Sequence, residues 1–487
     1  MPTLTSYGLM ISKAPSISID KLRKSLTYTN WVISDNVTVE NEDIIVNGNI
    51  LVEETGELTL LNCNVYMNTT HAGINNITVY GKFNAVNTTI TSLHKQFDYQ
   101  IKVINGTINL DRCIIEYSGV PCIVTMVGWF VFSYSSALSI IGWSTATINN
   151  TIIRHGGWYG IEVVGADVTI QNTFIEDVFC ALYVTYYLGI YVYRTSNVNI
   201  VNMTVINCDW AGNIESSNIN ITDSKFIHIP EPLYVNYFHF YDPSAEFRMS
   251  NTKLYWTSIY VSLDAQMCDN IHIDGSTLND KPIQYYYKQS NLDISNVELG
   301  ELIISFSQNI SITNSNISSI NVYSSSDLRI ANSIVEGGSF GVHVANITNL
   351  EIYNNLLRNT TACIIIECSE NVKVYNNTIH ADNLDIQYFI EAGRVAKTYL
   401  RGISIGSTNN SHIYNNTIYA EGLMSSAIYY SELINFTLES NYIYGQMTRF
   451  FRGDVVFEVD SWNISIINNT IEYISLVHAS NVSITKN

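Results

Sequence analysis

Residues 380–401 hold the densest set of side chains that can do chemistry. Carboxylates and guanidinium groups alternate there with aromatic residues, the charged members being Asp382, Asp385, Glu391, Arg394 and Arg401. A carboxylate pair can hydrolyse a glycosidic bond, and arginine beside a Ca²⁺-bound uronate can support elimination. These residue types therefore predict a polysaccharide-cleaving site if the segment lies over a groove. The alternative is a solvated loop whose charges pair with one another.

The histidines and cysteines form no metal-binding pattern. The ten histidines are scattered, and no His-x-His, Met-rich or Cys-x-x-Cys spacing occurs. We therefore expect no metal and no cofactor. Cys180 could pair with Cys208, and Cys363 with Cys368, but buried free thiols fit the sequence equally well.

The composition excludes several classes of partner. Acidic residues outnumber basic ones 43 to 24, which gives a formal net charge of −19. Nucleic acid and anionic membranes repel so negative a chain. Only 14% of the residues are charged, so uncharged polar residues and 33 Tyr make up most of the polar surface. We expect carbohydrate or cell-surface or virion protein subunits as partners, with a homo-oligomer or end-to-end assembly as a further option.

A repeat must position these side chains, and it is clearest in residues 371–379, NVKVYNNTI. It has an apolar pair at Val372 and Val374, two turn asparagines, and an apolar residue at Ile379. The Val374 position, here named the core column, recurs in 18 turns at spacings of about 25 residues, in the range of a solenoid. Its other members are Leu60, Ala85, Leu110, Thr147, Ile170, Ile200, Ile221, Met249, Ile273, Ile294, Ile312, Ile330, Ile352, Ile413, Leu438, Ile466 and Ile484.

Other columns repeat with the core column. Apolar residues two apart among Val, Ile and Thr predict a strand with one buried face, and the asparagines that follow are typical of a turn. One repeat is therefore one coil of two or three short strands. Asparagines in register can bond from coil to coil through their side-chain amides, which satisfies groups that are costly to bury. We predict an inward ladder two residues after the core column, as at Asn314, Asn354, Asn376, Asn415 and Asn468, with Asn377 in a less regular column.

Nineteen Asn-x-Ser/Thr sequons are candidate sites for N-linked glycans and favour an extracellular setting. Some belong to the predicted ladder and are expected to face inward without a glycan: Asn87, Asn149, Asn202, Asn376, Asn415 and Asn468. The predicted glycosylation sites lie off the ladder: Asn36, Asn68, Asn76, Asn105, Asn346 and Asn359.

The repeat resembles that of right-handed parallel β-helices of the pectin-lyase-like superfamily, whose asparagine ladders lie at such turns. It is also similar to repeats of archaeal surface proteins and of viral β-helix proteins. The resemblance covers about residues 44–487 and implies an all-β solenoid of about 18 turns. It implies no single activity, because this fold hosts lyases, hydrolases, tailspikes, adhesins and stalks. The signature motifs of family polygalacturonases and the stacked aspartates of the pectate lyase calcium site are absent.

We predict an N-terminal segment at 1–43 and one β-helix over 44–487. Longer insertions are expected near 116–146, 178–196 and 380–402. A short helix over residues 18–26, with Ser18 as its N-cap, is expected to cover the first coil, and a mobile terminus is the alternative.

An uncharged stretch, residues 117–153, is long enough to span a membrane. Its glycines and serines, and the repeats that resume directly after it, favour an inserted flap or an extra coil instead. At the other end the chain stops inside a repeat at Asn487. This predicts that the native polypeptide continues, or that its end docks on another subunit.

The sequence thus favours a non-catalytic extracellular β-helix rod. It would be a structural or adhesive protein of an archaeal cell surface or a virion, in contact with glycans or other subunits. The first 30 residues hold no apolar run typical of a signal peptide, which favours a virion protein or an unusual export route. The alternative is a polysaccharide lyase or glycoside hydrolase that uses residues 380–401. Carboxylates about 5 to 10 Å apart in an open groove would favour the enzyme, and arginines bonded to neighbouring coils would favour the rod.

Overall fold

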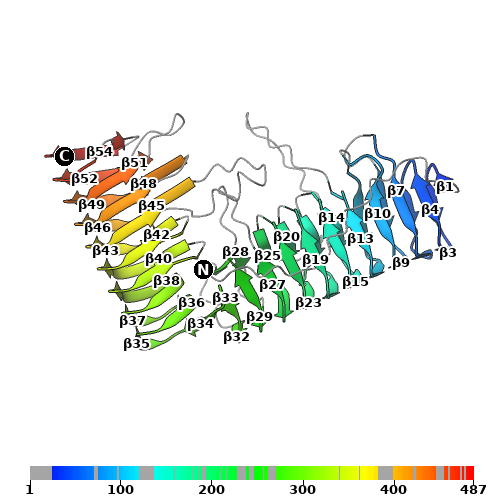
Figure 1. Ribbon diagram of the computed structural model, residues 1–487, viewed down its shortest axis with the longest axis horizontal. Coiled ribbons are helices and arrows are strands. Elements are labelled where there is room, and N and C mark those ends of the chain that lie inside the picture. Colours follow the sequence, from blue (N-terminus) through cyan, green and yellow to red (C-terminus); the bar gives the residue numbers. More distant parts are fainter. Residues whose placement is uncertain are drawn as a thin grey trace, which may run out of the picture.

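The chain is built from β-strands that pair in parallel from coil to coil (Figure 1). A computed structural model describes residues 25–70, 75–95, 98–119, 136–157, 159–178, 180–185, 187–188, 193–208, 210–214, 217–227, 237–240, 246–255, 257–261, 270–338, 340–360, 362–381, 399–420, 424–445, 455–458, 461–471, 474–476 and 479–486. Every element named in these ranges is a strand. The predicted all-β parallel β-helix is confirmed.

Residues 25–278, the first stack, wind into coils of three strands that build three parallel sheets. Sheet I contains β1 (Ser25–Tyr28), β4 (Asp43–Val46), β7 (Asn64–Met67), β10 (Thr89–Ser92), β13 (Ile114–Glu116), β16 (Ile152–Arg154), β19 (Phe174–Glu176), β24 (Thr204–Ile206), β27 (Lys225–Ile227), β30 (Lys253–Tyr255) and β33 (Thr277–Leu278). Sheet II contains β2 (Trp31–Ile33), β5 (Ile50–Val52), β8 (Asn76–Val79), β11 (Gln100–Ile104), β14 (Ser136–Ile141), β17 (Tyr159–Val164), β20 (Cys180–Thr185), β25 (Trp210–Ile214), β28 (Tyr237–Phe240) and β31 (Ser258–Val261). Sheet III contains β3 (Asn36–Glu40), β6 (Glu57–Leu61), β9 (Lys82–Val86), β12 (Thr107–Asp111), β15 (Thr145–Asn149), β18 (Asp167–Gln171), β23 (Asn197–Val201), β26 (Asn218–Thr222), β29 (Phe247–Ser250) and β32 (Ile271–Asp274).

Residues 281–485 form a second stack of coils (Figure 1). One face carries β34 (Lys281–Tyr287), β36 (Glu298–Ser305), β38 (Asn316–Ala331), β40 (Phe340–Tyr353), β42 (Ala362–Glu367), β45 (Tyr399–Gly406), β48 (Met424–Ser431), β51 (Val455–Glu458) and β53 (Ile474–Leu476). β38 and β40 are long enough to continue onto the next face with their C-terminal parts. The other strands of that face are β35 (Ser290–Ser295), β37 (Gln308–Thr313), β43 (Glu370–Tyr375), β46 (Asn409–Tyr414), β49 (Ile434–Glu439), β52 (Ser461–Ile467) and β54 (Ala479–Thr485). The third face includes β39 (Ile334–Glu336), β41 (Leu356–Arg358), β44 (Thr378–Ala381), β47 (Thr417–Ala420) and β50 (Tyr442–Gly445).

The two stacks meet at an angle (Figure 1). The antiparallel pair β33–β34 joins them, with Leu278 opposite Lys281. Beyond it, Ile303 of β36 and Tyr323 of β38 point out of the second stack and pack into the core of the first. The outer face of the second stack therefore covers the open end of the first, which would otherwise expose a bare edge.

Glu301 lies fully buried in this contact between the stacks. Its carboxylate accepts hydrogen bonds from the backbone N–H of Ile259 at 3.0 Å and from Nδ2 of Asn321 at 2.6 Å. Ile259 belongs to β31, the last strand of sheet II, so the carboxylate supplies an acceptor where that sheet ends. Burial raises the pKa of the Glu301 carboxyl to about 8.

The β-helix begins earlier than the predicted boundary between residues 43 and 44. β1, β2 and β3 pair in parallel with β4, β5 and β6, so residues 25–40 are already coil. Ser25 and Leu26, predicted to end a helix, belong to β1. The rest of that predicted helix lies outside the described residues.

The register predicted at Thr147 is wrong by one residue. Ile148 pairs with Leu110 and Ile170 and is buried, whereas Thr147 is exposed. A slip of one residue moves every side chain of a strand to the other face. The neighbouring asparagines, Asn149 and Asn150, allowed either reading, and Asn150 takes the turn conformation with φ of +49°.

The predicted insertions flank ordinary coil strands. β14 and β20 belong to sheet II, and a short antiparallel pair, β21 (Tyr187–Leu188) with β22 (Tyr193–Arg194), follows β20. Residues 120–135 and 382–398 lie outside the described residues. Where the structure describes the chain, no helix is long and apolar enough to cross a membrane.

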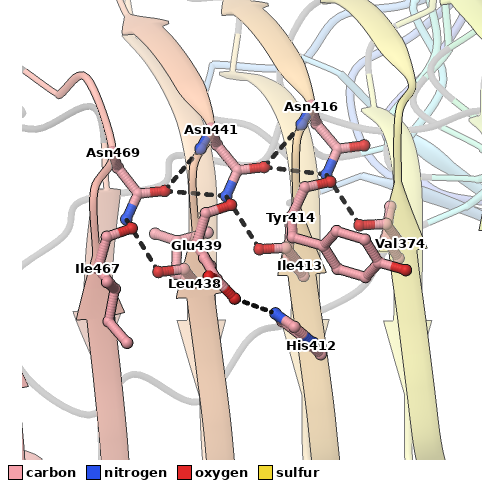
Figure 2. Close-up of polar contacts among 10 residues, drawn as sticks. All are labelled: Val374, His412, Ile413, Tyr414, Asn416, Leu438, Glu439, Asn441, Ile467 and Asn469. Carbon is pink, nitrogen blue, oxygen red and sulfur yellow. Dashed lines mark hydrogen bonds and ion pairs between the residues drawn. The ribbon is translucent and has the colours of Figure 1, made fainter.

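The inward asparagine ladder lies one residue later than predicted. Its members are buried and hydrogen-bonded in series: Asn355, Asn377, Asn416, Asn441 and Asn469. Figure 2 shows Asn416, Asn441 and Asn469: Oδ1 of Asn441 and of Asn469 accepts from Nδ2 of the preceding coil, and each Nδ2 also donates to a backbone carbonyl. The residues predicted for the ladder are exposed and left-handed, with φ between +52° and +56°: Asn314, Asn354, Asn376, Asn415 and Asn468. The left-handed residue makes the turn and points outward, which brings the next side chain inward.

Candidate functional site

The structure places one of the five predicted catalytic residues. Asp382, Asp385, Glu391 and Arg394 lie outside the described residues. Arg401 lies on β45, with its guanidinium carbon 4.2 Å from the centre of the Tyr429 ring on the next coil, and its Nη1 donates to Ser404 Oγ at 3.4 Å. These two contacts are thus with its own and the neighbouring coil.

A groove of about 510 Å³ crosses the outer face of sheet III from β15 to β29. These five strands, each about 4.8 Å from the next, make it roughly 19 Å long. Ten of its fourteen lining residues are polar or charged, because strand residues between the core positions face outward. The lining residues are Thr145, Ala146, Thr147, Asp167, Val168, Thr169, Asn197, Val198, Asn199, Asn218, Ile219, Asn220, Glu246 and Arg248.

One polar column along the groove is a hydrogen-bonded chain. Nδ2 of Asn197 donates to Oδ1 of Asp167 at 2.7 Å, and Nδ2 of Asn218 donates to Oδ1 of Asn197 at 2.9 Å. The series ends where Oδ1 of Asn218 accepts from the backbone N–H of Glu246 at 3.1 Å. These contacts fix the side chains of one wall before any ligand binds.

The second column retains unused hydrogen-bonding capacity. Nδ2 of Asn220 donates to Oδ1 of Asn199 at 2.8 Å, so the two side chains are linked to each other. Within the described residues, Nδ2 of Asn199, Oδ1 of Asn220 and the hydroxyls of Thr147 and Thr169 have no hydrogen-bond partner. A row of outward donors and acceptors on a rigid sheet suits a ligand rich in hydroxyl groups.

The charges of the groove lie toward its ends. Asp167 and Glu246 are separated by three strand steps, roughly 14 Å, whereas the carboxyl pair of a glycosidase is about 5 to 10 Å apart. Nε of Arg248 donates to Oε1 of Glu246 at 2.9 Å, which pairs that carboxylate locally. The spacing of these two carboxylates therefore differs from that of a glycosidase pair. The described residues hold no group of three or more His, Cys, Asp or Glu that could bind a metal ion.

A row of tyrosines on the second stack is an unsuitable sugar platform. The Tyr353, Tyr375 and Tyr414 rings are stacked 4.8 Å apart and nearly parallel. The Arg329 guanidinium lies 5.0 Å over Tyr353, and the His412 ring lies 4.4 Å from Tyr414. Neighbouring side chains thus occupy the ring faces that a sugar would need.

The predicted glycosylation sites differ in their surroundings. Asn36, Asn105 and Asn346 are exposed, and Asn68, Asn76 and Asn359 are half-buried. Nδ2 of Asn68 donates to Asn47 at 2.7 Å, and Nδ2 of Asn346 donates to Ser324 at 3.2 Å. The sequons expected to face inward do not do so: Asn87, Asn202, Asn376, Asn415 and Asn468 are exposed, and Asn149 is half-buried.

The sequence analysis did not identify the groove, although the polar column that lines it recurs in the sequence. Asp167 and Asn197 stand three residues before core positions, where Asn or Asp recurs along the chain. That recurrence indicates a repeat, and it does not reveal which coils are hollowed. Among the described cysteines, no disulfide joins Cys180 to Cys208 or Cys363 to Cys368.

Solved structures resemble this chain at low identity. PfbA, a surface adhesin of Streptococcus pneumoniae, is 11% identical with a TM-score of 0.32, over 92% of this chain and 86% of PfbA. The periplasmic alginate epimerase AlgG is 12% identical with a TM-score of 0.21, over 88% and 77%. A chain of the Vag8–C1 inhibitor complex is 10% identical with a TM-score of 0.30, over 94% and 100%. No family model and no curated protein matches the chain. These likenesses assign no activity and no ligand to it.

Proposed function

We propose that this protein is a non-catalytic, extracellular β-helix whose sheet III groove binds a carbohydrate polymer. The observation that carries the proposal is the row of outward amides and hydroxyls along the groove, centred on Asn199 and Asn220. Sugar hydroxyls both donate and accept hydrogen bonds, so they match such a surface better than an apolar ligand does.

The negative charge of the chain and of the groove favours a neutral polymer over an anionic one. The chain carries a formal net charge of −19, and two carboxylates, Asp167 and Glu246, line the groove. A polyanion would meet repulsion at long range and at both of these positions. A neutral polysaccharide fits best, and its repeating units would follow the repeating coils.

Binding by wild-type protein and two double variants tests the groove. Neutral oligosaccharides selected on a glycan array would be titrated against Asn199→Ala/Asn220→Ala and against Asn84→Ala/Asn109→Ala. The control pair stands at equivalent positions of sheet III outside the groove and bonds in the same way, at 2.9 Å. We expect at least tenfold weaker binding for the groove variant and unchanged binding for the control. Equal affinities in the two variants would contradict the proposal.

The alternative function is a polysaccharide lyase or glycoside hydrolase whose candidate catalytic residues lie within 380–401. A lyase or hydrolase would lose activity on polysaccharide when Asp382, Asp385 or Glu391 is changed to its amide. Depolymerisation by the wild-type protein, followed by reducing-end or unsaturated-product assays, decides between the two. Sustained turnover that these changes abolish would overturn the non-catalytic proposal.

The setting of the rod is part of the proposal. An archaeal cell surface and a virion both fit a long β-helix that holds a carbohydrate or another subunit. Detection of the protein in a purified surface-layer fraction or in purified virions would distinguish them. Recovery from the cytosolic fraction alone would contradict an extracellular rod.

A further inference from the structure

Three sequons of the second stack share one position on the turns that leave the core column. Asn376, Asn415 and Asn468 are followed two residues later by threonine. All three are left-handed, with φ of +55°, +55° and +52°, and all three side chains are exposed. Asn376 and Asn415 follow adjacent strands, and Asn468 lies two coils further on. They form a row along one edge of the second stack.

The amides of this row are free. Among the residues that the structure describes, none of the three side chains makes a hydrogen bond. Other exposed sequons of the same stack are engaged, since Nδ2 of Asn435 donates to Asn410 at 3.1 Å and Nδ2 of Asn463 donates to Asn435 at 3.0 Å. In these two side chains Nδ2 already donates to an asparagine of another coil, so a sugar on that nitrogen would disturb an existing hydrogen bond.

We propose that Asn376, Asn415 and Asn468 are the N-glycan acceptors of the second stack. In the transfer, Nδ2 bonds to the anomeric carbon of a lipid-phosphate-linked oligosaccharide. The bond from that carbon to the phosphate oxygen breaks, the phosphate leaves with the electron pair, and one amide proton passes to a base. The sequon threonines face outward, because Thr378 and Thr470 are exposed and Thr417 is half-exposed. The next asparagines, Asn377, Asn416 and Asn469, stay buried in the inner ladder.

This inference rests on the proposed extracellular location, which gives the chain access to a glycan donor. It reverses the sequence-based expectation that Asn415 and Asn468 stay unmodified. Of the sites expected from sequence, Asn36 and Asn105 keep an exposed side chain whose Nδ2 donates to nothing in the described part, so they remain predictions. A row of glycans would lie along one edge of the second stack, whereas the sheet III groove belongs to the first stack.

Glycopeptide mass spectrometry of protein purified from its native source tests the row. We expect glycans on the peptides containing Asn376, Asn415 and Asn468, and none at Asn435 or Asn463. The variant Thr378→Ala/Thr417→Ala/Thr470→Ala, made in the native host, should lose the mass of these glycans and keep the groove's carbohydrate affinity. Glycans at Asn435 or Asn463 with none on the row would overturn the site assignment while supporting the extracellular location. Unmodified protein would also overturn it, and cell fractionation would then decide the location separately.

Discussion

The buried carboxyl of Glu301, between the two stacks, leads to a prediction about stability and pH. Replacing Glu301 with Gln keeps an acceptor for Ile259 N–H and for Asn321 Nδ2, and it mimics the protonated acid. It removes only the ability to ionise. We therefore expect Glu301→Gln to be more stable than the wild type at neutral and alkaline pH, and nearly as stable at pH 4.

The magnitude follows from the raised pKa. Burial moves the pKa of Glu301 from 4.5 to about 8. In the unfolded chain the Glu301 carboxyl ionises above pH 4.5, whereas in the folded chain it stays protonated up to about pH 8. The free energy of unfolding is therefore highest below pH 4.5 and falls as the pH rises to about 8. At about 1.4 kcal/mol per pKa unit, the loss is roughly 3 kcal/mol at pH 7 and on the order of 5 kcal/mol above pH 8. Glu301→Gln does not show this loss, because its side chain cannot ionise.

Urea unfolding at pH 4, 7 and 9 measures the effect as the difference between variant and wild type. Other titrating groups cancel in that difference. Glu298→Gln on the same strand is the matched control, since Glu298 is largely exposed and pairs with Lys281 at 3.3 Å, and its change should stay within about 1 kcal/mol. A difference between Glu301→Gln and wild type that does not grow with pH would refute the assignment of a buried, protonated Glu301.

Three further substitutions test the coils. Asn377→Ala removes an amide from the buried ladder and should cost about 1 to 3 kcal/mol of unfolding free energy. Asn376→Gly keeps the left-handed turn and should cost far less, so equal urea midpoints for the two would contradict the ladder placement. Ile352→Asp buries an unpaired charge in the core column and should cost several kcal/mol. A melting temperature like that of the wild type would exclude the repeat alignment.

The coils could be predicted because burial repeats at fixed offsets. Ile330, Ile352 and Val374 pair in register and are fully buried, as the core column predicts. The direction of a turn residue could not be predicted in the same way. Asn376 and Asn377 are identical in type, and the left-handed backbone at the first decides which of them faces inward.

The angle between the stacks had no signal in the repeat. Ile273 and Ile294 are 21 residues apart, within the normal spacing, yet their strands belong to different stacks. Ile303 and Tyr323 look like ordinary outward residues until the first stack is placed against them. The groove depended on the same kind of information, since Asn84 and Asn199 stand in the same column of sheet III but only Asn199 lines the groove.

The cover on the first stack has a consequence for synthesis on the ribosome. Coils of the first stack can add one by one as the chain emerges, but the end strand β31 waits for Glu301 and Tyr323, the latter roughly 60 residues later. At about 5 to 20 residues per second, this edge stays open for several seconds in each nascent chain. During that interval it can pair with the same edge of a nascent chain on a neighbouring ribosome. The yield of correctly folded protein should therefore fall as the number of ribosomes on one messenger RNA increases.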